Sequence, residues 1–465
     1  MTFNILGQFK GDPWPYQAED GNKIVRHKRM ILGHKTGLGK TFISLYALCK
    51  AKDLRRVIIV ATNSALPVWM DEIPKWSEVG SNLVYVSKDT PNKESVWKTI
   101  THKDFSGVVL INHTQFRILT QWLQEVHGLH YKKPVWDAII VDEAHKLKSR
   151  TSQLYDAVNA HKSEWLLFLT ATPASRGAQD MWAYLHLLDP KYFPSYWQFV
   201  NTFCFVEETN WGKDVFGTRN AAALKKTLER YYVSRKYGDV KKDMPPLRRQ
   251  LVHVEMESVQ EKLYNQMNDN DLLPTDNGLI VAPGTLALMT RLRQLALCPQ
   301  VLSPELPVGT GVQYIIDDLM SFDPEERHTV IFSEYKEVLK VIEMSVQGTV
   351  TKNVFFLKGG MSPEQIKEQI DGWKKTRGIM LCVLACAQSF ALDTGHIAYV
   401  LGASCDPIVN IQAEGRLRRG DSNLPPEGVL IKYIIPAGTR EESTRHILNE
   451  KVGTVKNFLE DFGAS

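Results

Sequence analysis

The sequence has no long apolar run, and no window approaches the roughly 18 consecutive apolar residues that a membrane-spanning helix requires. This excludes an integral membrane protein, and we expect no membrane partner. Residues 1–10 also lack the apolar core of a signal peptide and the Arg- and Ser-rich pattern of a transit peptide. We therefore expect an intracellular, cytoplasmic protein.

Cysteine is scarce, with six in 465 residues, and no two of them form a CxxC pair. They are Cys49, Cys204, Cys298, Cys382, Cys386 and Cys405. In a chain of this length, such scattered cysteines argue against a disulfide framework and against a cysteine zinc site. Reduced thiols, as in an intracellular protein, are expected.

A charge excess of one sign is also missing, because 56 Lys and Arg face 52 Asp and Glu, for a formal net charge of +4. Bulk charge therefore does not mark a nucleic-acid-binding protein, and any such binding must depend on a local groove. The 43% hydrophobic content is too high for a disordered chain. The length predicts about two to four globular domains.

Short apolar runs are what the sequence has instead, separated by polar stretches that are compatible with helices. The runs in the first half lie at 30–32, 57–61, 107–111, 138–141 and 166–169, and those in the second half at 329–332, 354–357, 379–384, 397–401 and 429–435. Continuous apolar runs favour strands buried on both faces, which is typical of parallel α/β sheets. Between about 190 and 299 the sequence is aromatic, charged and helix-like. We therefore predict an α/β fold with a first α/β unit at 1–190, helical protrusions and a linker at 191–300, and a second α/β unit at 301–465.

A glycine-rich segment at residues 33–41, here called the phosphate loop, joins the first apolar run to a helix-compatible stretch. It reads Gly33-His34-Lys35-Thr36-Gly37-Leu38-Gly39-Lys40-Thr41. A strand, a glycine-rich turn, a Lys-Thr pair and a helix hold a triphosphate, because backbone N–H groups and the helix N-terminus face the phosphates. We expect Lys40 to reach the β- and γ-phosphates and Thr41 to ligate Mg²⁺.

A second acidic motif follows the apolar run at 138–141, where the sequence reads Asp142-Glu143-Ala144-His145. A strand that delivers two carboxylates at its end supplies the other half of a nucleotide site. Asp142 is expected to hold Mg²⁺, and Glu143 to orient and deprotonate the attacking water. His145 is expected to couple this site to a neighbouring motif.

The phosphate loop and the Asp-Glu-Ala-His motif form a DEAH-box pattern, and the chain resembles the superfamily 2 helicases and translocases. Further motifs follow in the family's order: Tyr16-Gln17 (Q motif), 61–72 (motif Ia, with Trp69 and Glu72), 111–114 (motif Ib), Thr170-Ala171-Thr172-Pro173 (motif III), 330–333 (motif IV) and 412–420 (motif VI). The resemblance implies two RecA-like parallel-sheet lobes in tandem, with helical insertions between them. It also implies ATP and Mg²⁺ as cofactors.

The same resemblance assigns residues to the nucleotide and to its coupling with the cleft between lobes. It implies that Tyr16, Gln17, Gly37, Leu38, Gly39, Lys40 and Thr41 bind the nucleotide, that Thr170 and Thr172 report its state, and that Gln412, Arg416 and Arg419 complete catalysis. The two arginines are effective only if the second lobe closes on the nucleotide, where such guanidinium groups are worth roughly 10³–10⁵ in rate. Cleft opening after hydrolysis would then drive stepping.

Within that superfamily the chain is most similar to the SWI/SNF-like double-stranded DNA translocases. The phosphate loop has their Gly-Leu-Gly-Lys-Thr form, residues 234–246 resemble their inter-lobe linker, and 292–299 resemble the helix before their second lobe. His396, Cys405-Asp406-Pro407 and Gln412-Ala413-Glu414 are similar to the annealing-helicase branch.

Two positions depart from that family. Its motif V is rich in glycine, whereas this chain has Ala385-Cys386-Ala387-Gln388-Ser389-Phe390. Where the family usually has an acidic residue in the phosphate loop, this chain has His34. Neither departure removes a group that performs chemistry.

Nucleic-acid contacts are expected from polar side chains at strand ends, since backbone tracking needs hydroxyls, amides and lysines. The residues chosen are Thr62, Asn63, Asn112, Thr114, Ser333 and Lys358. Residues 225–249 contain nine Lys and Arg against three Asp and Glu, with Tyr231, Tyr232 and Tyr237 among them. This segment is compatible both with a DNA channel and with a solvated helical face.

Three functions stay open at this point. The first is an ATP-driven motor on double-stranded or branched DNA, either a translocase or a helicase. The second is a DEAH-box-type RNA helicase, which motif III and the linker disfavour. The third is a nucleotide-gated motor subunit that acts mainly through a protein partner. Because little length remains beyond two lobes, we expect a minimal phage or bacterial enzyme.

Overall fold

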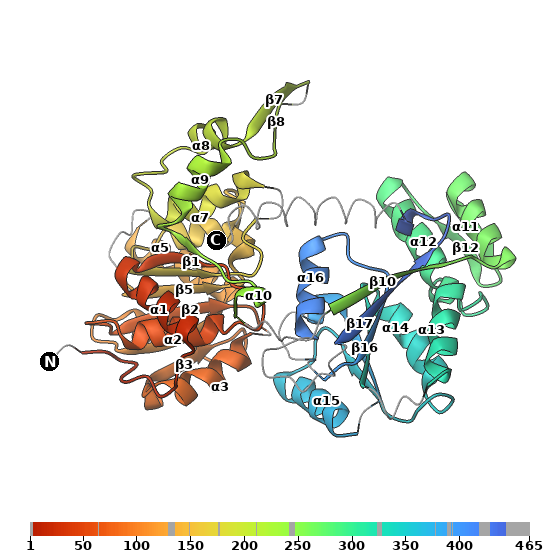
Figure 1. Ribbon diagram of the computed structural model, residues 1–465, viewed down its shortest axis with the longest axis horizontal. Coiled ribbons are helices and arrows are strands. Elements are labelled where there is room, and N and C mark those ends of the chain that lie inside the picture. The colour runs from red at the N-terminus through yellow and green to blue at the C-terminus, as the bar shows by residue number, and fades with distance from the viewer. Residues whose placement is uncertain are drawn as a thin grey trace. The chain divides into compact units, whose positions relative to one another are not determined.

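The structure is a computed structural model that describes residues 3–63, 65–128, 135–147, 149–174, 177–210, 212–240, 247–322, 328–376, 378–387, 392, 394–417 and 428–442. The described chain separates into two compact units, one up to residue 240 and the other from residue 247 (Figure 1). No helix within these ranges is long and apolar enough to cross a membrane. The predicted three-part division at 190 and 300 stays a prediction.

The first unit is built on a parallel sheet in the order β3-β4-β2-β5-β6-β1-β9. Its strands are β1 Arg29–Leu32, β2 Arg56–Ala61, β3 Leu83–Val86, β4 Gly107–Asn112, β5 Ala138–Asp142, β6 Trp165–Leu169 and β9 Tyr232–Val233. Its helices are α1 Pro15–His27, α2 Lys40–Cys49, α3 Leu66–Trp76, α4 Lys93–Thr101, α5 His113–His127, α6 Gln153–Asn159, α7 Met181–Leu188, α8 Tyr196–Phe203, α9 Ala221–Leu228 and α10 Tyr237–Val240. Short 3₁₀ turns are η1 Gly80–Asn82, η2 Ala144–Leu147 and η3 Ala178–Asp180, and β7 Phe205–Thr209 pairs with β8 Gly212–Phe216 in a separate hairpin.

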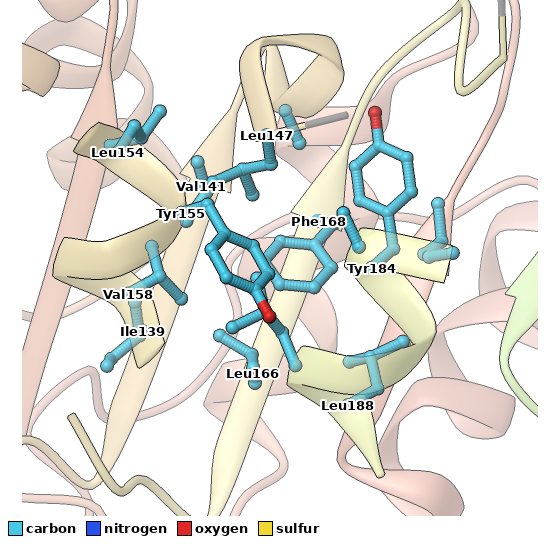
Figure 2. Close-up of a cluster of buried hydrophobic side chains, with 14 of the residues drawn as sticks. Ile139, Val141, Leu147, Leu154, Tyr155, Val158, Leu166, Phe168, Tyr184 and Leu188 are labelled. Atoms are coloured by element: carbon cyan, nitrogen blue, oxygen red, sulfur yellow. The ribbon is translucent and has the colours of Figure 1, made fainter. Parts of the chain in front are cut away.

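Both faces of this sheet are buried because alternate residues of each strand point to opposite sides. In β5, Ile139 and Val141 join one apolar cluster, while Ala138 and Ile140 join the other. Figure 2 shows the first cluster, where Phe168 of β6 lies among side chains from α6 and α7, including Tyr155 and Tyr184. The predicted doubly buried strands of this half are confirmed.

The second unit contains a parallel sheet in the order β10-β17-β16-β13-β15-β14. Its strands are β10 Leu247–Val254, β13 His328–Ser333, β14 Val354–Leu357, β15 Gly378–Val383, β16 Ile397–Leu401 and β17 Val429–Pro436. Its helices are α11 Ser258–Asn270, α12 Thr285–Leu297, α13 Thr310–Met320, α14 Lys336–Val346, α15 Pro363–Thr376 and α16 Pro407–Arg416, with turns η4 Pro299–Val301 and η5 Leu384–Cys386. A hairpin of β11 Leu272–Thr275 and β12 Gly278–Val281 lies outside the sheet. The predicted α/β class, with two parallel-sheet units, is therefore confirmed.

The stretch between 190 and 299 is not only helical, contrary to the expectation from its composition. It contains α8, α9, α11 and α12, but also two hairpins and the strands β9 and β10, which belong to the two main sheets. Among the described strands β10 pairs only with β17, and it exposes most of its charged residues, so it is an edge strand without a continuous apolar run. β9 has two residues, too few to give a periodic signal.

Candidate nucleotide-binding site

Three parallel strands of the first unit end at the same edge of the sheet. Leu32 at the end of β1 is in register with Leu169 of β6, and Leu169 is in register with Asp142 of β5. The phosphate loop, the Asp142-Glu143 pair and Thr170 therefore leave the sheet on one side. In parallel α/β sheets, ligands bind at this carboxyl edge.

The phosphate loop depends on glycine at the position before α2. Gly39 has φ +72° and precedes Lys40, the first residue of the helix. A Cβ atom on Gly39 would lie 2.7 Å from Gln17 Nε2, so a side chain here would both strain the backbone and collide. The Tyr16 hydroxyl donates to the carbonyl of Leu38 at 3.2 Å. Tyr16 therefore braces the end of the phosphate loop, and Gln17 lies close to Gly39.

Lys40 lies between its own loop and the acidic motif. Its Nζ donates to the backbone carbonyl of His34 at 3.0 Å. Burial and the neighbouring Glu143 carboxylate raise the pKa of Asp142, whereas the hydrogen bond from Trp69 and the charge of Lys40 lower it. Lys40 and Asp142 therefore attract each other electrostatically.

The backbone turns sharply after Asp142. Glu143 has φ +48°, a left-handed conformation that non-glycine residues rarely adopt outside functional or tightly constrained sites. Its backbone N–H donates to Asp142 Oδ1 at 2.9 Å. His145 Nδ1 lies 3.1 Å from Glu143 Oε2, so the predicted coupling residue touches the predicted catalytic carboxylate.

Asp142 forms hydrogen bonds with two residues that the sequence motifs did not connect with it. The indole of Trp69, in α3, donates to Asp142 Oδ2 at 2.9 Å. His113 Nε2, in α5, lies 3.0 Å from the Asp142 carbonyl oxygen, and burial lowers the pKa of His113 to about 4, so the ring is neutral and donates. Trp69 and His113 belong to the segments that resemble motifs Ia and Ib. Their position in these motifs is the sequence signal that could have suggested contacts with Asp142.

Motif III also reaches this edge. Thr170 and Thr172 are fully buried, and the backbone N–H of Thr172 donates to Thr170 Oγ1 at 3.1 Å. The Thr170 N–H donates to the carbonyl of Leu32, the residue before the phosphate loop, at 3.2 Å. The turn after β6 is therefore tied to the strand that carries the loop.

Side chains predicted to contact nucleic acid gather at the ends of β2 and β4. Asn112 Nδ2 donates to Asn63 Oδ1 at 2.7 Å, while Asn112 Oδ1 caps α5 by accepting from the Gln115 N–H. Thr114 lies in the first turn of α5 and is exposed, whereas Thr62 is buried. The structure brings these four residues to the same edge as the nucleotide-site candidates.

His34, the departure within the phosphate loop, is buried and paired. Its Nε2 lies 2.9 Å from Asp20 Oδ2. Asp20 also accepts two hydrogen bonds from Arg235, at 3.0 and 2.8 Å, and Arg235 forms a further ion pair with Glu19 at 2.8 Å. Burial would raise the pKa of Asp20, but the hydrogen bonds from His34 and Arg235 lower it overall, so the carboxylate is charged.

In the second unit, α16 carries the first residues of the segment that resembles motif VI. Gln412 is buried, and Arg416 is the last residue of the helix. Glu414 accepts two hydrogen bonds from Arg249 of β10, at 2.8 and 2.6 Å, and one from the Tyr433 hydroxyl of β17 at 2.7 Å. The helix is thereby fixed to two neighbouring strands.

A comparison with families of known proteins agrees with this arrangement. The family model described as the SNF2-related domain matches residues 14–301, more than half of the chain. The chain belongs to the SNF2-related family. The match begins before the Q-motif residues and ends in η4 of the second unit.

Several curated proteins are similar to this SNF2-related chain. The CHD3-type chromatin-remodeling factor CHR7 of Arabidopsis thaliana is 24% identical over 97% of the chain and 38% of its own length. The ISWI chromatin-remodeling complex ATPase ISW1 of Saccharomyces cerevisiae is 25% identical over 71% of the chain and 30% of its own length. The chain thus spans less than two fifths of the length of these relatives.

One solved structure is similar over nearly the whole chain. A Sulfolobus solfataricus SWI2/SNF2 ATPase core in complex with dsDNA is 19% identical, and the match covers 98% of this chain and 95% of that chain, with a TM-score of 0.44.

The remaining predicted residues of the SNF2-related chain belong to the second unit or lie outside the described residues. Ser333 is fully buried, and its hydroxyl accepts from the Tyr335 N–H at 3.2 Å, which is the role of a turn residue. The Lys358 ammonium lies 5.2 Å from the Phe356 ring centre. Arg419 and the motif V residues Gln388-Ser389-Phe390 lie outside the described residues.

The basic segment 225–249 is not a free DNA-facing surface as a whole. Tyr231 and Tyr232 are buried in the core of the first unit. Arg235 and Arg249 are occupied by the carboxylates of Asp20 and Glu414. This corrects the interpretation that tyrosines and arginines along this segment line a channel together.

Proposed function

We propose that this chain hydrolyses ATP with Lys40, Asp142 and Glu143 as its central groups. The observation that carries the proposal is the common position of the phosphate loop and the acid pair at one carboxyl edge of the sheet. Lys40 neutralises β- and γ-phosphate charge, and Glu143 accepts the proton of the attacking water. The DEAH-type reading of residues 142–145 is part of this proposal.

The proposed metal is Mg²⁺, ligated by Asp142 and Thr41 and completed by phosphate oxygens and water. Within the described ranges no group of three His, Cys, Asp or Glu side chains could hold a metal alone. This fits Mg²⁺ in nucleotide sites, which takes one or two protein ligands. Because the pKa of Asp142 is raised by burial and by Glu143, a divalent cation would relieve the repulsion within the acid pair.

The proposed partner is double-stranded or branched DNA, on which ATP turnover drives translocation or remodelling. Family membership supports it, and one similar human protein, 23% identical over 96% of the chain and 17% of its own length, is named Chromodomain-helicase-DNA-binding protein 6. We propose that Asn63, Asn112 and Thr114 contact the DNA backbone, with Thr62 and Lys358 as further candidates. Ser333 is left out because it is fully buried.

The second unit is proposed to complete the reaction. Gln412, Arg416 and Arg419 would contribute to γ-phosphate stabilisation when nucleotide is bound, and Tyr16 and Gln17 would read the adenine. We also propose that Thr170 and Thr172 couple the state of the nucleotide to the cleft between the lobes, and that His145 couples the nucleotide site to a neighbouring motif. An intracellular site of action fits this function. CHR7, ISW1 and the human protein are eukaryotic and give no support to a phage or bacterial origin.

The proposal is tested by steady-state ATP hydrolysis without nucleic acid and with single-stranded DNA, duplex DNA, forked DNA or RNA. Lys40→Ala serves as the blank. We expect stimulation by duplex or forked DNA that the variant lacks. Stimulation by RNA alone would replace the proposal with an RNA helicase. Full hydrolysis by Lys40→Ala would show that another group does the chemistry, and turnover that appears only with an added protein would favour a motor subunit.

A further inference from the structure

A path of contacts, buried at Asp20 and His34, runs from Arg235 to the lysine of the phosphate loop. Arg235 grips Asp20 with two hydrogen bonds, Asp20 lies 2.9 Å from His34 Nε2, and the His34 carbonyl accepts from Lys40 Nζ at 3.0 Å. Asp20 and His34 are 1% and 0% exposed. Arg235 follows Asp20 by 215 residues in the sequence. The contact chain therefore joins a distant segment to the nucleotide site.

The protonation states of Asp20 and His34 follow from the hydrogen-bond donors and acceptors around them. Asp20 already accepts from the guanidinium and is charged, so His34 must present its Nε2 as a donor. Burial lowers the pKa of His34, which keeps the ring neutral and leaves Nδ1 as an acceptor. Nδ1 is buried and has no hydrogen-bond partner among the described residues. The histidine is thus held by a single side-chain bond, the one to Asp20.

The backbone beside this chain of contacts fixes the same two segments. The Gly33 N–H donates to the Val233 carbonyl at 2.7 Å, and the Lys35 N–H donates to the Arg235 carbonyl at 3.3 Å. Ser234 Oγ donates to the Gly33 carbonyl at 3.0 Å. Residues 233–235 therefore lie directly along the first residues of the phosphate loop.

We propose that Arg235 and Asp20 are positioning residues of the phosphate loop that act through His34 on Lys40. The inference rests on the proposed ATP site and adds to it residues that set its geometry. The paired guanidinium fixes the carboxylate, the carboxylate fixes the imidazole, and the imidazole fixes the backbone carbonyl that holds the Lys40 ammonium. A bidentate Arg–carboxylate pair is directional in a way that a lysine ion pair is not, so the geometry of the guanidinium matters as well as its charge.

The test measures the Kd of a fluorescent ATP analogue, mant-ATP with Mg²⁺, together with the melting temperature. Arg235→Lys keeps the charge but loses the planar guanidinium that forms two hydrogen bonds with Asp20. We expect this variant to raise the Kd about tenfold, which corresponds to ~1.4 kcal/mol. His34→Ala is expected to raise the Kd by a similar factor. In the His34→Ala background, Arg235→Lys should add little, because both changes interrupt the same path. His34→Gln, whose amide can still donate to Asp20, should keep most of the affinity.

Arg29→Lys is the matched control. Arg29 lies at the other end of β1, where its guanidinium donates to the carbonyls of Leu188, Ser163 and Leu187. The control should lower the melting temperature without changing the Kd for mant-ATP.

Arg235→Lys and His34→Ala that bind mant-ATP like wild type would overturn the inference, as would fully additive effects of the two. If the wild-type chain itself fails to bind mant-ATP, the proposed function falls with it, an outcome that the wild-type measurement separates from the failure of this inference alone.

Discussion

The indole Nε1 of Trp69 lies 2.9 Å from Oδ2 of Asp142 and donates a hydrogen bond to it. Asp142 Oδ1 accepts from the Glu143 N–H, so both carboxylate oxygens are oriented by the chain itself. Trp69 is 1% exposed and lies in α3, just after the turn at Thr62 and Asn63. One helix thus connects the proposed DNA-contacting turn to the proposed Mg²⁺ ligand.

We predict that Trp69→Phe lowers kcat for ATP hydrolysis about tenfold, because a buried hydrogen bond to a charged group is worth about 1.5–3 kcal/mol. The carboxylate would lose its orientation toward the cation, so the Mg²⁺ concentration for half-maximal activity should rise. Steady-state rates over a Mg²⁺ titration measure both effects.

Trp136→Phe is the control for this prediction. Trp136 is also fully buried, but its Nε1 has no hydrogen-bond partner among the described residues. The control should lose packing without changing the Mg²⁺ requirement. Equal Mg²⁺ titration curves for the two variants would contradict a specific role for Trp69.

His34→Asp, which introduces the acidic residue usual in the similar translocases, is predicted to harm this chain. It would place a second carboxylate beside Asp20, and the free energy of unfolding should fall by about 3 kcal/mol, because a buried charge would be left without compensation. Adding Asp20→Asn removes the like charge and should restore part of the loss. Chemical denaturation of the single and double variants tests this, and a single variant as stable as wild type would refute it.

Arg249 is predicted to affect the rate of ATP hydrolysis without affecting nucleotide affinity. It grips Glu414 in α16, the helix that ends at Arg416, so loosening it should affect turnover more than binding to the phosphate loop. Because the Arg249 side chain is half-exposed, we expect Arg249→Lys to lower kcat about fivefold, or ~1 kcal/mol. The Kd for mant-ATP should stay unchanged. Tyr433→Phe removes one bond to the same carboxylate and should have a smaller effect; a larger effect from Tyr433→Phe would argue against Arg249 as the main anchor.

Stability is predicted to fall below neutral pH, partly because of His161. Burial lowers the pKa of His161 to about 4, and its Nε2 lies 2.9 Å from Thr120 Oγ1. The unfolded chain binds this proton near pH 6.5 and the folded chain only near pH 4, so stability is lost as the pH falls through that window. The contribution is about 3 kcal/mol at most. His161→Gln should flatten the slope of unfolding free energy against pH between 6.5 and 4, and an unchanged slope would show that other groups cause it.

The core strands could be predicted because their apolar runs are continuous and both faces are buried, as in β5 and β13. The edge strand β3 is mostly half-buried, and β9 has two residues, so neither leaves a clear pattern. Lys40 and Asp142 could be proposed for a nucleotide site from local motifs. The pairing of Asp20 with Arg235 could not, since a contact across 215 residues depends on the tertiary fold. The sequence showed that His34 replaces the acidic residue usual in the family. The physical reason for a histidine there is its burial beside Asp20, which only the structure shows.

We propose that ATP turnover at Lys40 moves the chain along duplex DNA. Displacement of a third strand from a DNA triplex, followed over time with ATP and Mg²⁺, measures this without requiring strand separation. We predict displacement by the wild-type chain and none by Lys40→Ala or with a non-hydrolysable ATP analogue. A wild-type chain that hydrolyses ATP in the presence of duplex DNA yet leaves the triplex intact would contradict the account.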